Sequence, residues 1–486
     1  MINELGHILH EYWPHIVLTV SVVASVSTAI HAAMTKEDVR AAIGWVAVVI
    51  FSPLLGATFY LFAGINRVRR QRVSDQRKLA EQERDRLERL QVSGIPAGFD
   101  EHIKPLQRLG DGINGHVLLQ GNEIALLDGG DQTYVAMIEA IESAQRSVAL
   151  QSYIFDHDGI GMRIAQALIA AKVRGVKVRV LIDAVGAKYS RPPITGMLTE
   201  AGVPVGLFLP TAIGIRLVYA NMRSHRKLLV VDGTRALTGG MNIREAFMRE
   251  FAGEAVAVDT HFNVTGPICD HLMDSFAHDW EFTTGERLEG DLWFGRFDGP
   301  DAKRGVPMRL VLSGPDREVG RNQSMLLGAL SVARHHVRIQ SPYFLPEPVL
   351  LGALVTAARL GVRVDVVIPG NNNLRLVSAA MEAQLEQLLQ GGVNVWRAQG
   401  AFDHSKLMSV DDQWCYVGSS NVDPRSQRLN FELDLEVYDR QLAQQIATGI
   451  DHKIAHAQRA TLAELAKRPF WLRLRNRFVW LASPLL

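Results

Sequence analysis

The sequence predicts an α/β protein of two duplicated α/β sandwich domains that form one pseudo-twofold active site, preceded by a two-helix transmembrane hairpin. Three observations lead to this fold class. Two apolar stretches near the start contain no charged residue, apolar β-branched runs alternate with helical stretches twice in the same order, and each copy carries one histidine–lysine–aspartate motif. A chain of 486 residues is also too long for one ordinary core.

The first element is a membrane anchor over residues 1–66. Residues 15–34 and 41–65 lack Asp, Glu, Lys and Arg, and each matches the ~20 apolar residues that cross a bilayer. A cleavable signal peptide would explain only the first stretch and would begin with basic residues, whereas this start is acidic. A buried helical hairpin is the remaining alternative to two transmembrane helices.

The charges beside these stretches predict the orientation of the anchor. Four arginines lie in "RVRRQR" (67–72), directly after the second stretch, whereas the short loop between the stretches carries Lys36 and Arg40 with two acids. The positive-inside rule then puts both ends of the chain in the cytoplasm, and the arginines would attract anionic lipid head groups. Residues 67–100 are expected to be a charged helical linker that serves as a spacer.

The soluble part is predicted to contain two copies of one plan, a first domain over residues 101–300 and a second over 301–455. The boundary falls in a Gly- and Pro-rich stretch, residues 295–307. Three pairs of segments match in the same order: "RSVALQSYIF" (146–155) with "HHVRIQSPYF" (335–344), "AAKVRGVKVRVLID" (170–183) with "TAARLGVRVDVVIP" (356–369), and "AGVPVGLF" (201–208) with "GGVNVWRA" (391–398).

Overall charge and cysteine content exclude some classes of function. The 52 Lys and Arg residues nearly balance the 51 Asp and Glu residues, so no global charge argues for a nucleic-acid partner. Cys269 and Cys415 belong to no metal-ligand cluster and form no disulfide framework, so we expect two reduced thiols.

The motif His-x-Lys-x(4)-Asp occurs once in each copy, and an asparagine follows ten residues after each aspartate. Gly240 and Ser419 lie two residues before these asparagines, and we group them with the asparagines as substrate-binding candidates. The catalytic candidates are His225, Lys227 and Asp232 in the first copy and His404, Lys406 and Asp411 in the second, and the asparagines are Asn242 and Asn421.

Two such motifs that meet about a pseudo-dyad would suit a phosphodiester. The lysines would neutralise the non-bridging oxygens and the asparagines would donate hydrogen bonds to them. One histidine would attack phosphorus while the other protonates the leaving alcohol. No metal or other cofactor is expected, because the lysines supply the positive charge and the sequence lacks an Asp-rich metal cluster and a phosphate-cradling glycine loop.

Further carboxylates are candidates for orienting or supporting roles. Asp259 and Glu432 occupy matching positions, and each is expected to fix the tautomer of the histidine in its own copy, the alternative being two exposed strand acids. Asp232 and Asp411 follow apolar strands at a turn, where holding the loop and the cleft, by hydrogen bonds across the copies, is the expected role.

The acid before the second histidine suggests which histidine does what. Asp403 directly precedes His404 and is expected to hold that imidazole protonated, which suits a general acid. This asymmetry favours His225 as the nucleophile only weakly. Neighbours along a strand point to opposite faces, which would weaken this coupling.

These motifs resemble the signature of the phospholipase D superfamily, His-x-Lys-x(4)-Asp with a downstream Gly-Gly/Ser-x-Asn. Within it, the chain is similar over nearly its full length to the bacterial cardiolipin synthase family, on "QSYIFDHDGIG", "RSHRKLLVVDG", "GGMNI", "QSPYFLP" and "GSSNVDPRSQRLNFE". The resemblance implies transfer of a phosphatidyl group between two phosphatidylglycerols through a phosphohistidine, with glycerol released. It also implies a multi-pass protein of the bacterial inner membrane, with catalytic domains on the cytoplasmic side and anionic lipid, not nucleic acid, as partner. The resemblance is also the main support for His225 as the nucleophile, because many enzymes that resemble this chain attack with the histidine of the first copy. Homo-oligomer formation stays open.

Several alternatives remain at this stage. A phospholipase D-type hydrolase would use water as acceptor, a phosphatidylserine synthase would use CDP-diacylglycerol and serine, and a membrane-tethered nuclease would need a basic groove. Two intact motifs argue against an inactive scaffold. The C-terminal segment 456–486 alternates arginines with Trp and Phe and is expected either to lie in a membrane interface or to pack as an amphipathic helix.

Overall fold

The computed structural model divides into two compact units, one built from Met1–Arg69 with Ala212–Ala220 and one from Arg70–Thr211 with Asn221–Leu486. Most of the expected linker, residues 67–100, lies outside the described residues. The residues described are 2–36, 39–61, 98–113, 115–210, 222–297, 305–315 and 318–483.

The described residues of the first unit form the helices α1 (Ile2–Thr35), α2 (Val39–Phe51) and α3 (Pro53–Phe59). The Tyr12–Thr35 part of α1 is long and apolar enough to cross a membrane, and it is the one such helix in the described part of the chain. The expected second span, 41–65, is divided after Ser52, because Pro53 lacks the N–H that would continue the helix. Its last four residues lie outside the described residues, so the second span is not confirmed.

The three helices pack against one another through polar contacts as well as apolar ones. The Ser25 hydroxyl donates to the carbonyl oxygen of Val49 over 2.8 Å, which joins α1 to α2. His31 Nδ1 lies 2.8 Å from the hydroxyl of Tyr60, directly after α3. These contacts satisfy polar groups inside an otherwise apolar unit.

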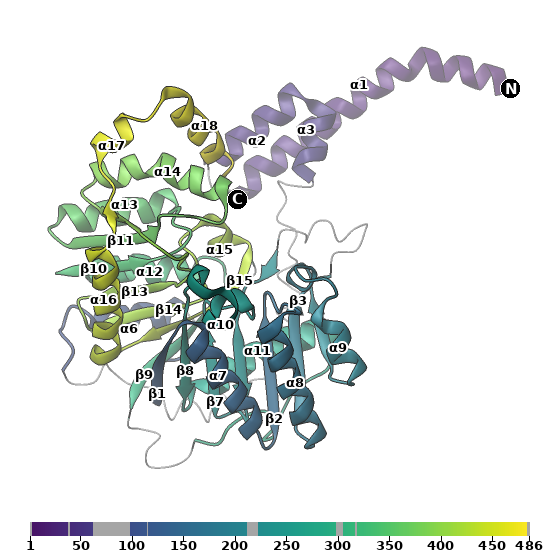
Figure 1. The fold of residues 1–486 in the computed structure, drawn as a ribbon. Coiled ribbons are helices and arrows are strands. Elements are labelled where there is room, and N and C mark those ends of the chain that lie inside the picture. Colours follow the sequence, from purple (N-terminus) through teal and green to yellow (C-terminus); the bar gives the residue numbers. More distant parts are fainter. Residues whose placement is uncertain are drawn as a thin grey trace. The chain divides into compact units, whose positions relative to one another are not determined.

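The second unit is organised by a 16-stranded sheet that runs through both copies (Figure 1). The first copy supplies β1 (Leu119–Asp128), β2 (Ser147–Ser152), β3 (Lys177–Asp183), β4 (Val205–Phe208), β5 (Arg223–Ser224), β6 (Leu228–Val231), β7 (Arg235–Gly239) and β8 (Thr260–Thr265). The second supplies β9 (Val306–Ser313), β10 (His336–Gln340), β11 (Arg363–Pro369), β12 (Asn394–Ala398), β13 (Leu407–Val410), β14 (Trp414–Gly418), β15 (Asn430–Val437) and β16 (Gln458–Arg459).

The order of the strands makes the duplication visible. From the centre outward, one half runs β1-β8-β7-β6-β2-β3-β4 and the other runs β9-β15-β14-β13-β10-β11-β12. The halves meet where β1 pairs antiparallel with β9, so a pseudo-twofold axis lies at this junction. The mixed α/β fold with two matching copies predicted from the repeats is confirmed, and the copies form one compact unit joined through their sheet.

Helices cover the sheet and complete three apolar cores. One core lies in each copy, and a third is shared: Phe276 of α11 and Ile446 of α16 pack in the same cluster as Leu310 of β9 and Leu435 of β15. The shared core stabilises the junction between the copies by burying side chains from both. The helices of this unit are α6 (Lys104–Ile113), α7 (Gly129–Ser143), α8 (Gly159–Val173), α9 (Ile194–Glu200), α10 (Arg249–Ala252), α11 (Ile268–Thr284), α12 (Arg321–Val332), α13 (Pro348–Arg359), α14 (Arg375–Gln390), α15 (Pro424–Arg428), α16 (Arg440–Ala455), α17 (Leu462–Ala466) and α18 (Phe470–Leu481).

The motif aspartates Asp232 and Asp411 brace turns within their own copies. Each has a positive φ, 52° and 51°, directly after its strand. Asp232 accepts hydrogen bonds from the backbone N–H groups of Gln145, Arg146 and Ser147, at 2.9, 2.7 and 2.9 Å. Asp411 accepts from those of Arg334, His335 and His336, all at 2.8 Å.

Their placement agrees with the expected role of holding a turn and corrects their inclusion among the catalytic candidates. Asp232 and Asp411 are not part of the catalytic cluster, because β6 and β13 separate them from the histidines, which precede those strands. Their backbone bonds stay within one copy, but the Asp411 carboxylate also lies 2.9 Å from His102 Nε2, in the first of the two predicted domains. Each carboxylate satisfies the N–H groups at the start of the neighbouring β2 or β10, which otherwise lack strand partners.

We predict that Asp232→Ala lowers the melting temperature by roughly 5–10 °C, because three backbone donors lose a charged acceptor. The catalytic rate of the folded fraction should stay within about twofold, since the side chain does not reach the histidines. Thermal unfolding and activity measured in the same detergent would check both parts. A large loss of rate at unchanged melting temperature would contradict the bracing role.

Candidate active site

Each histidine lies in an extended segment just before a strand, and the backbone of that segment is held by the other copy. The N–H of His225 donates to the carbonyl of Phe431 over 2.8 Å, and the N–H of His404 donates to that of Val258 over 2.7 Å. The two acceptors come directly before the carboxylates Glu432 and Asp259 in the sequence. The pseudo-twofold arrangement therefore brings each histidine beside the carboxylate of the opposite copy.

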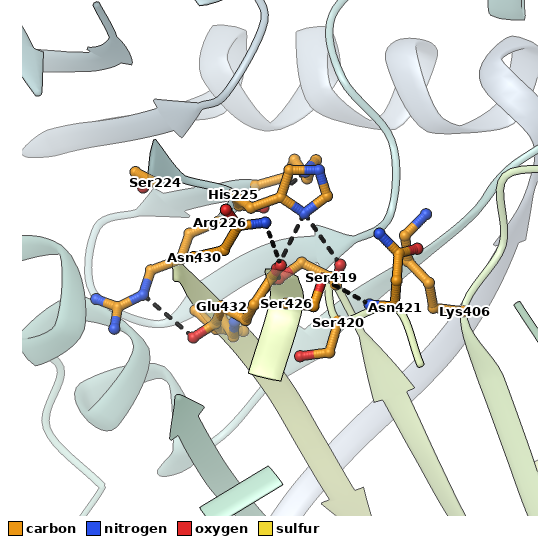
Figure 2. Close-up of polar contacts among 12 residues, drawn as sticks. Ser224, His225, Arg226, Lys406, Ser419, Ser420, Asn421, Ser426, Asn430 and Glu432 are labelled. Carbon is orange, nitrogen blue, oxygen red and sulfur yellow. Dashed lines mark hydrogen bonds and ion pairs between the residues drawn. The ribbon is translucent and has the colours of Figure 1, made fainter. Parts of the chain in front are cut away.

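The side chains complete this exchange between copies. His225 Nδ1 lies 3.0 Å from Glu432 Oε2, as Figure 2 shows, and His404 Nδ1 lies 2.8 Å from Asp259 Oδ2. Asp259 and Glu432 are thus confirmed as partners of the histidines, but the expectation that each serves its own copy is wrong. A carboxylate at Nδ1 fixes that proton and leaves the Nε2 lone pair for chemistry.

Ser419 and Gly240 lie against the carboxylates, and their assignment to substrate binding stays a prediction. The Ser419 hydroxyl donates to Glu432 Oε2 over 2.6 Å and accepts from the N–H of Leu433 over 2.9 Å. A side chain at Gly240 would come within 2.4 Å of Asp259 Oδ1. Ser419 also contacts the histidine directly, since its carbonyl oxygen lies 3.2 Å from His225 Nδ1.

The two motif lysines are buried beside the histidines. Lys227 Nζ donates to the carbonyl oxygen of His225 over 2.6 Å, and Lys406 Nζ lies 2.9 Å from His404 Nδ1. Burial lowers the pKa of Lys227 to about 7 and that of Lys406 to about 8. Two buried ammonium groups favour binding of an anionic ligand, because the negative charge compensates for the hydration energy that the lysines lose on burial.

The two asparagines are buried near these groups but are bonded differently. Asn242 Oδ1 accepts from the N–H of Ile154 over 3.1 Å, which leaves its amide group as a donor. Asn421 Oδ1 has no hydrogen-bond partner among the described residues. A cavity of ≈ 20 Å³, enough for one water molecule, is lined by Asn421 and Lys406. The unpaired atom is an acceptor whose burial costs about 1–3 kcal/mol, so a water or a ligand hydroxyl in this cavity would satisfy it, and the amide N–H groups would be the donors to phosphate oxygens.

The expected effect of Asp403 on His404 is not what the structure shows. One Asp403 oxygen accepts from the N–H of Ser405 over 2.9 Å, and the other pairs with Lys453 of α16. Burial, together with Lys406 and Lys227, holds the pKa of His404 well below its ordinary value despite the opposing effect of Asp403. Burial also lowers the pKa of His225, so both imidazoles are neutral in the empty site at pH 7.

Sequence reasoning missed several residues that shape the site. The rings of Tyr153 and Tyr343 lie 5.4 and 6.0 Å from the rings of His225 and His404. Both tyrosines come from the matched segments "QSYIF" and "QSPYF", one position apart in the alignment, so the presence of a tyrosine in each segment was the available signal. They would form side walls for a bound phosphodiester.

A third missed residue, Arg226, holds the first histidine segment from the side opposite the histidine. Arg226 lies between His225 and Lys227 and points to the opposite side, where it is fully buried. Its guanidinium donates to Asp279 over 2.9 Å and to Ser275 over 3.1 Å, both on α11. The alternation of side chains along an extended segment could have indicated this inward direction.

Comparison with known proteins matches this geometry to a family. The family described as "Cardiolipin synthase, PLD-like domain" matches residues 137–280 and 326–454, one range in each copy. The chain belongs to this cardiolipin synthase family. A second family, "Phospholipase_D-nuclease N-terminal", matches residues 18–64.

Relatives within the cardiolipin synthase family extend over most of the chain. The chain is 31% identical to cardiolipin synthase A of Serratia proteamaculans, with 93% of this chain and 94% of that protein covered. It is 30% identical to the cardiolipin synthase of Alkalihalophilus pseudofirmus, with 91% and 88% covered. The crystal structure of phosphatidylserine synthase from Haemophilus influenzae has the same fold, with a TM-score of 0.59 and 17% identity over 78% of this chain and 100% of that one.

We predict that Glu432→Gln lowers kcat by about 10²- to 10³-fold with little change in KM, because the amide neither fixes the His225 tautomer nor stabilises its positive charge. Glu436→Gln is the matched control, since Glu436 lies on the same strand but bonds Arg309 over 2.8 Å, outside the site. The control should lose thermal stability and keep its kcat. Equal kcat losses in the two variants would contradict the orienting role of Glu432.

The lysine pKa values give a pH dependence. Lys227 and Lys406 are protonated below pH values of about 7 and 8 and lose their charge above them, whereas a phosphodiester stays singly negative throughout. KM for an anionic phospholipid should therefore rise at least about threefold between pH 6.5 and pH 9. Initial rates in detergent micelles across this range would measure it, and a constant KM up to pH 9 would refute it.

Proposed function

We propose that this phosphatidyltransferase joins two phosphatidylglycerol molecules into cardiolipin and releases glycerol. The observation that carries the proposal is the pair of histidines, each held at Nδ1 by the other copy's carboxylate. The two buried lysines between them supply a place for one phosphodiester. Membership of the cardiolipin synthase family supports the choice of substrate.

The first half-reaction forms a covalent intermediate. Nε2 of His225 attacks phosphorus, the bond from phosphorus to the glycerol oxygen breaks, and His404 gives its proton to that oxygen. The negative phosphate raises the pKa of His404 on binding, so that this imidazole takes up a proton from solvent before the leaving alcohol needs it. Lys227, Lys406 and the asparagine amides stabilise the charge on the non-bridging oxygens.

The second half-reaction reverses the proton transfer. A hydroxyl of the second phosphatidylglycerol gives its proton to His404 and attacks phosphorus, and the bond to His225 Nε2 breaks. Cardiolipin leaves and both imidazoles return to their starting state. The assignment of attack to His225 now rests on the family resemblance alone, because Asp403 does not hold His404 protonated.

The anchor is part of the proposal. We infer two transmembrane helices, over about residues 15–34 and 41–65, with the catalytic copies on the cytoplasmic side of the bacterial inner membrane. The family match over residues 18–64 spans both stretches, and the arginines of residues 67–72 support the orientation. A break at Pro53 is compatible with a spanning helix, since proline kinks are tolerated in membrane helices.

Purified protein with phosphatidylglycerol as the only lipid should make cardiolipin and glycerol in equal amounts. His225→Ala and His404→Ala should each lower the rate more than about 10³-fold, because neither copy holds a spare nucleophile or acid. Labelled lipid, quenched in alkaline detergent and mapped by peptide, should place the phosphoryl group on His225. Phosphatidic acid as the main product would favour the hydrolase instead, and label on His404 would reverse the roles.

The proposed topology predicts the behaviour of reporter fusions. A periplasmic reporter inserted after Lys36 should be active, and the same reporter at the carboxyl terminus should be inactive, because the positive flank stays inside. Fusions with a cytoplasmic reporter should give the opposite pattern. Activity of one reporter at both places would contradict the two-span arrangement.

A further inference from the structure

The C-terminal helix α18 has two different sides. One side packs on α14: Asn476 is buried, and Val479 and Trp480 are partly buried against the core of the second copy. Figure 1 shows α18 alongside α14 at the edge of this copy. Packing against the core therefore accounts for the residues on one side of the helix and leaves the large apolar residues on its other side exposed.

The outer side exposes a stripe of large apolar residues. Trp471 and Phe478 are 74% and 64% exposed, and Phe470 and Leu481 are similarly exposed. At 100° per residue Trp471 and Phe478 point within about 20° of each other, and Leu481 lies beside them. Single exposed apolar residues are ordinary, but four on one side of a twelve-residue helix form a patch that calls for a partner.

Arginines border this stripe on both sides. By the same helical geometry Arg475 lies on one border, and Arg473 and Arg477 lie on the other. Arg477 also contacts Glu386 of α14 over 3.1 Å. The sequence contains no Asp or Glu after Glu464, so every charged side chain of this helix is basic.

These features favour one occupant. A second copy of the same helix would bring arginines against arginines, which is unfavourable without a counter-charge. A nucleic acid would not cover the aliphatic part of the stripe. An anionic bilayer satisfies both parts, because apolar and aromatic side chains enter the head-group boundary while flanking arginines reach the phosphates.

We propose that the outer face of α18 is a second membrane contact, which lies in the interface of an anionic bilayer. This contact is additional to the N-terminal anchor and does not depend on the reaction assigned above. Through α14 it would fix the second copy to the membrane surface, and with it the histidine segment before β13. The partner is the lipid surface itself, recognised by its apolar boundary and its negative phosphates.

Site-directed fluorescence on the full chain tests the contact. Cys269 and Cys415 are fully buried, so a thiol-reactive nitrobenzoxadiazole would label an introduced cysteine selectively. Phe478→Cys is the test variant and Val173→Cys, on an 82% exposed residue at the end of α8, is the control. Both are reconstituted in vesicles of phosphatidylglycerol and phosphatidylethanolamine that contain lipid spin-labelled near the head group.

The label at position 478 should be quenched at least about twofold more than the label at position 173. Arg473→Glu with Arg475→Glu in the Phe478→Cys background should reduce this difference, because the negative surface then repels the helix. Equal quenching at both positions would overturn the proposal. Emission at 478 that shifts with protein concentration and is unaffected by the spin label would identify a second copy as occupant and overturn it as well. Unchanged quenching in the charge-reversed variant would contradict the part of the proposal in which the helix recognises anionic lipid.

Discussion

The structure depends on the exchange of histidine partners between the two copies. Each histidine takes its backbone acceptor and its carboxylate from the opposite copy, so His225 is held by Phe431 and Glu432. Neither copy contains a complete acid, nucleophile and orienting group by itself. The junction of β1 with β9 and the core shared by α11 and α16 must therefore form before either histidine is correctly oriented. The geometry of the active site therefore depends directly on a stable interface between the two copies.

Charge balance places a second constraint on the site. Lys227 and Lys406 are buried with the carboxylates Glu432 and Asp259, so the empty site contains opposite charges at close range and needs no bulk solvent. The two carboxylates are not equivalent. Contact with His225 and Lys227 keeps the pKa of Glu432 below its ordinary value despite burial, whereas burial raises that of Asp259 to about 6. The duplicated site is symmetric in its residues but not in its proton affinities.

Sequence reasoning found the fold and the residues of the site, because both occur as repeats. Matched segments predicted two copies of one α/β plan, and the motif predicted the histidines, lysines and asparagines. It could not predict that His225 pairs with Glu432 of the other copy. Alignment of the copies identifies equivalent positions, whereas the residues that contact one another depend on how the two copies pack. Motif membership likewise grouped Asp232 with the catalytic candidates, although its position at a turn already predicted a structural role, because recurrence does not reveal the direction of a side chain. Asp403 forms an ion pair with Lys453, 50 residues further along the chain, and nothing in the local sequence around Asp403 indicates this partner.

The continuous sheet has a consequence for biosynthesis. Until β9 emerges from the ribosome, β1 is paired on one side only, by β8, and presents an open edge to any other strand. The nascent first copy is then a half-sheet whose edge matches the edge of another nascent half-sheet. Chains translated close together would risk pairing with each other instead of with their own second half. An amino-terminal helix that enters the membrane early would limit this risk, because it separates growing chains before the edge forms.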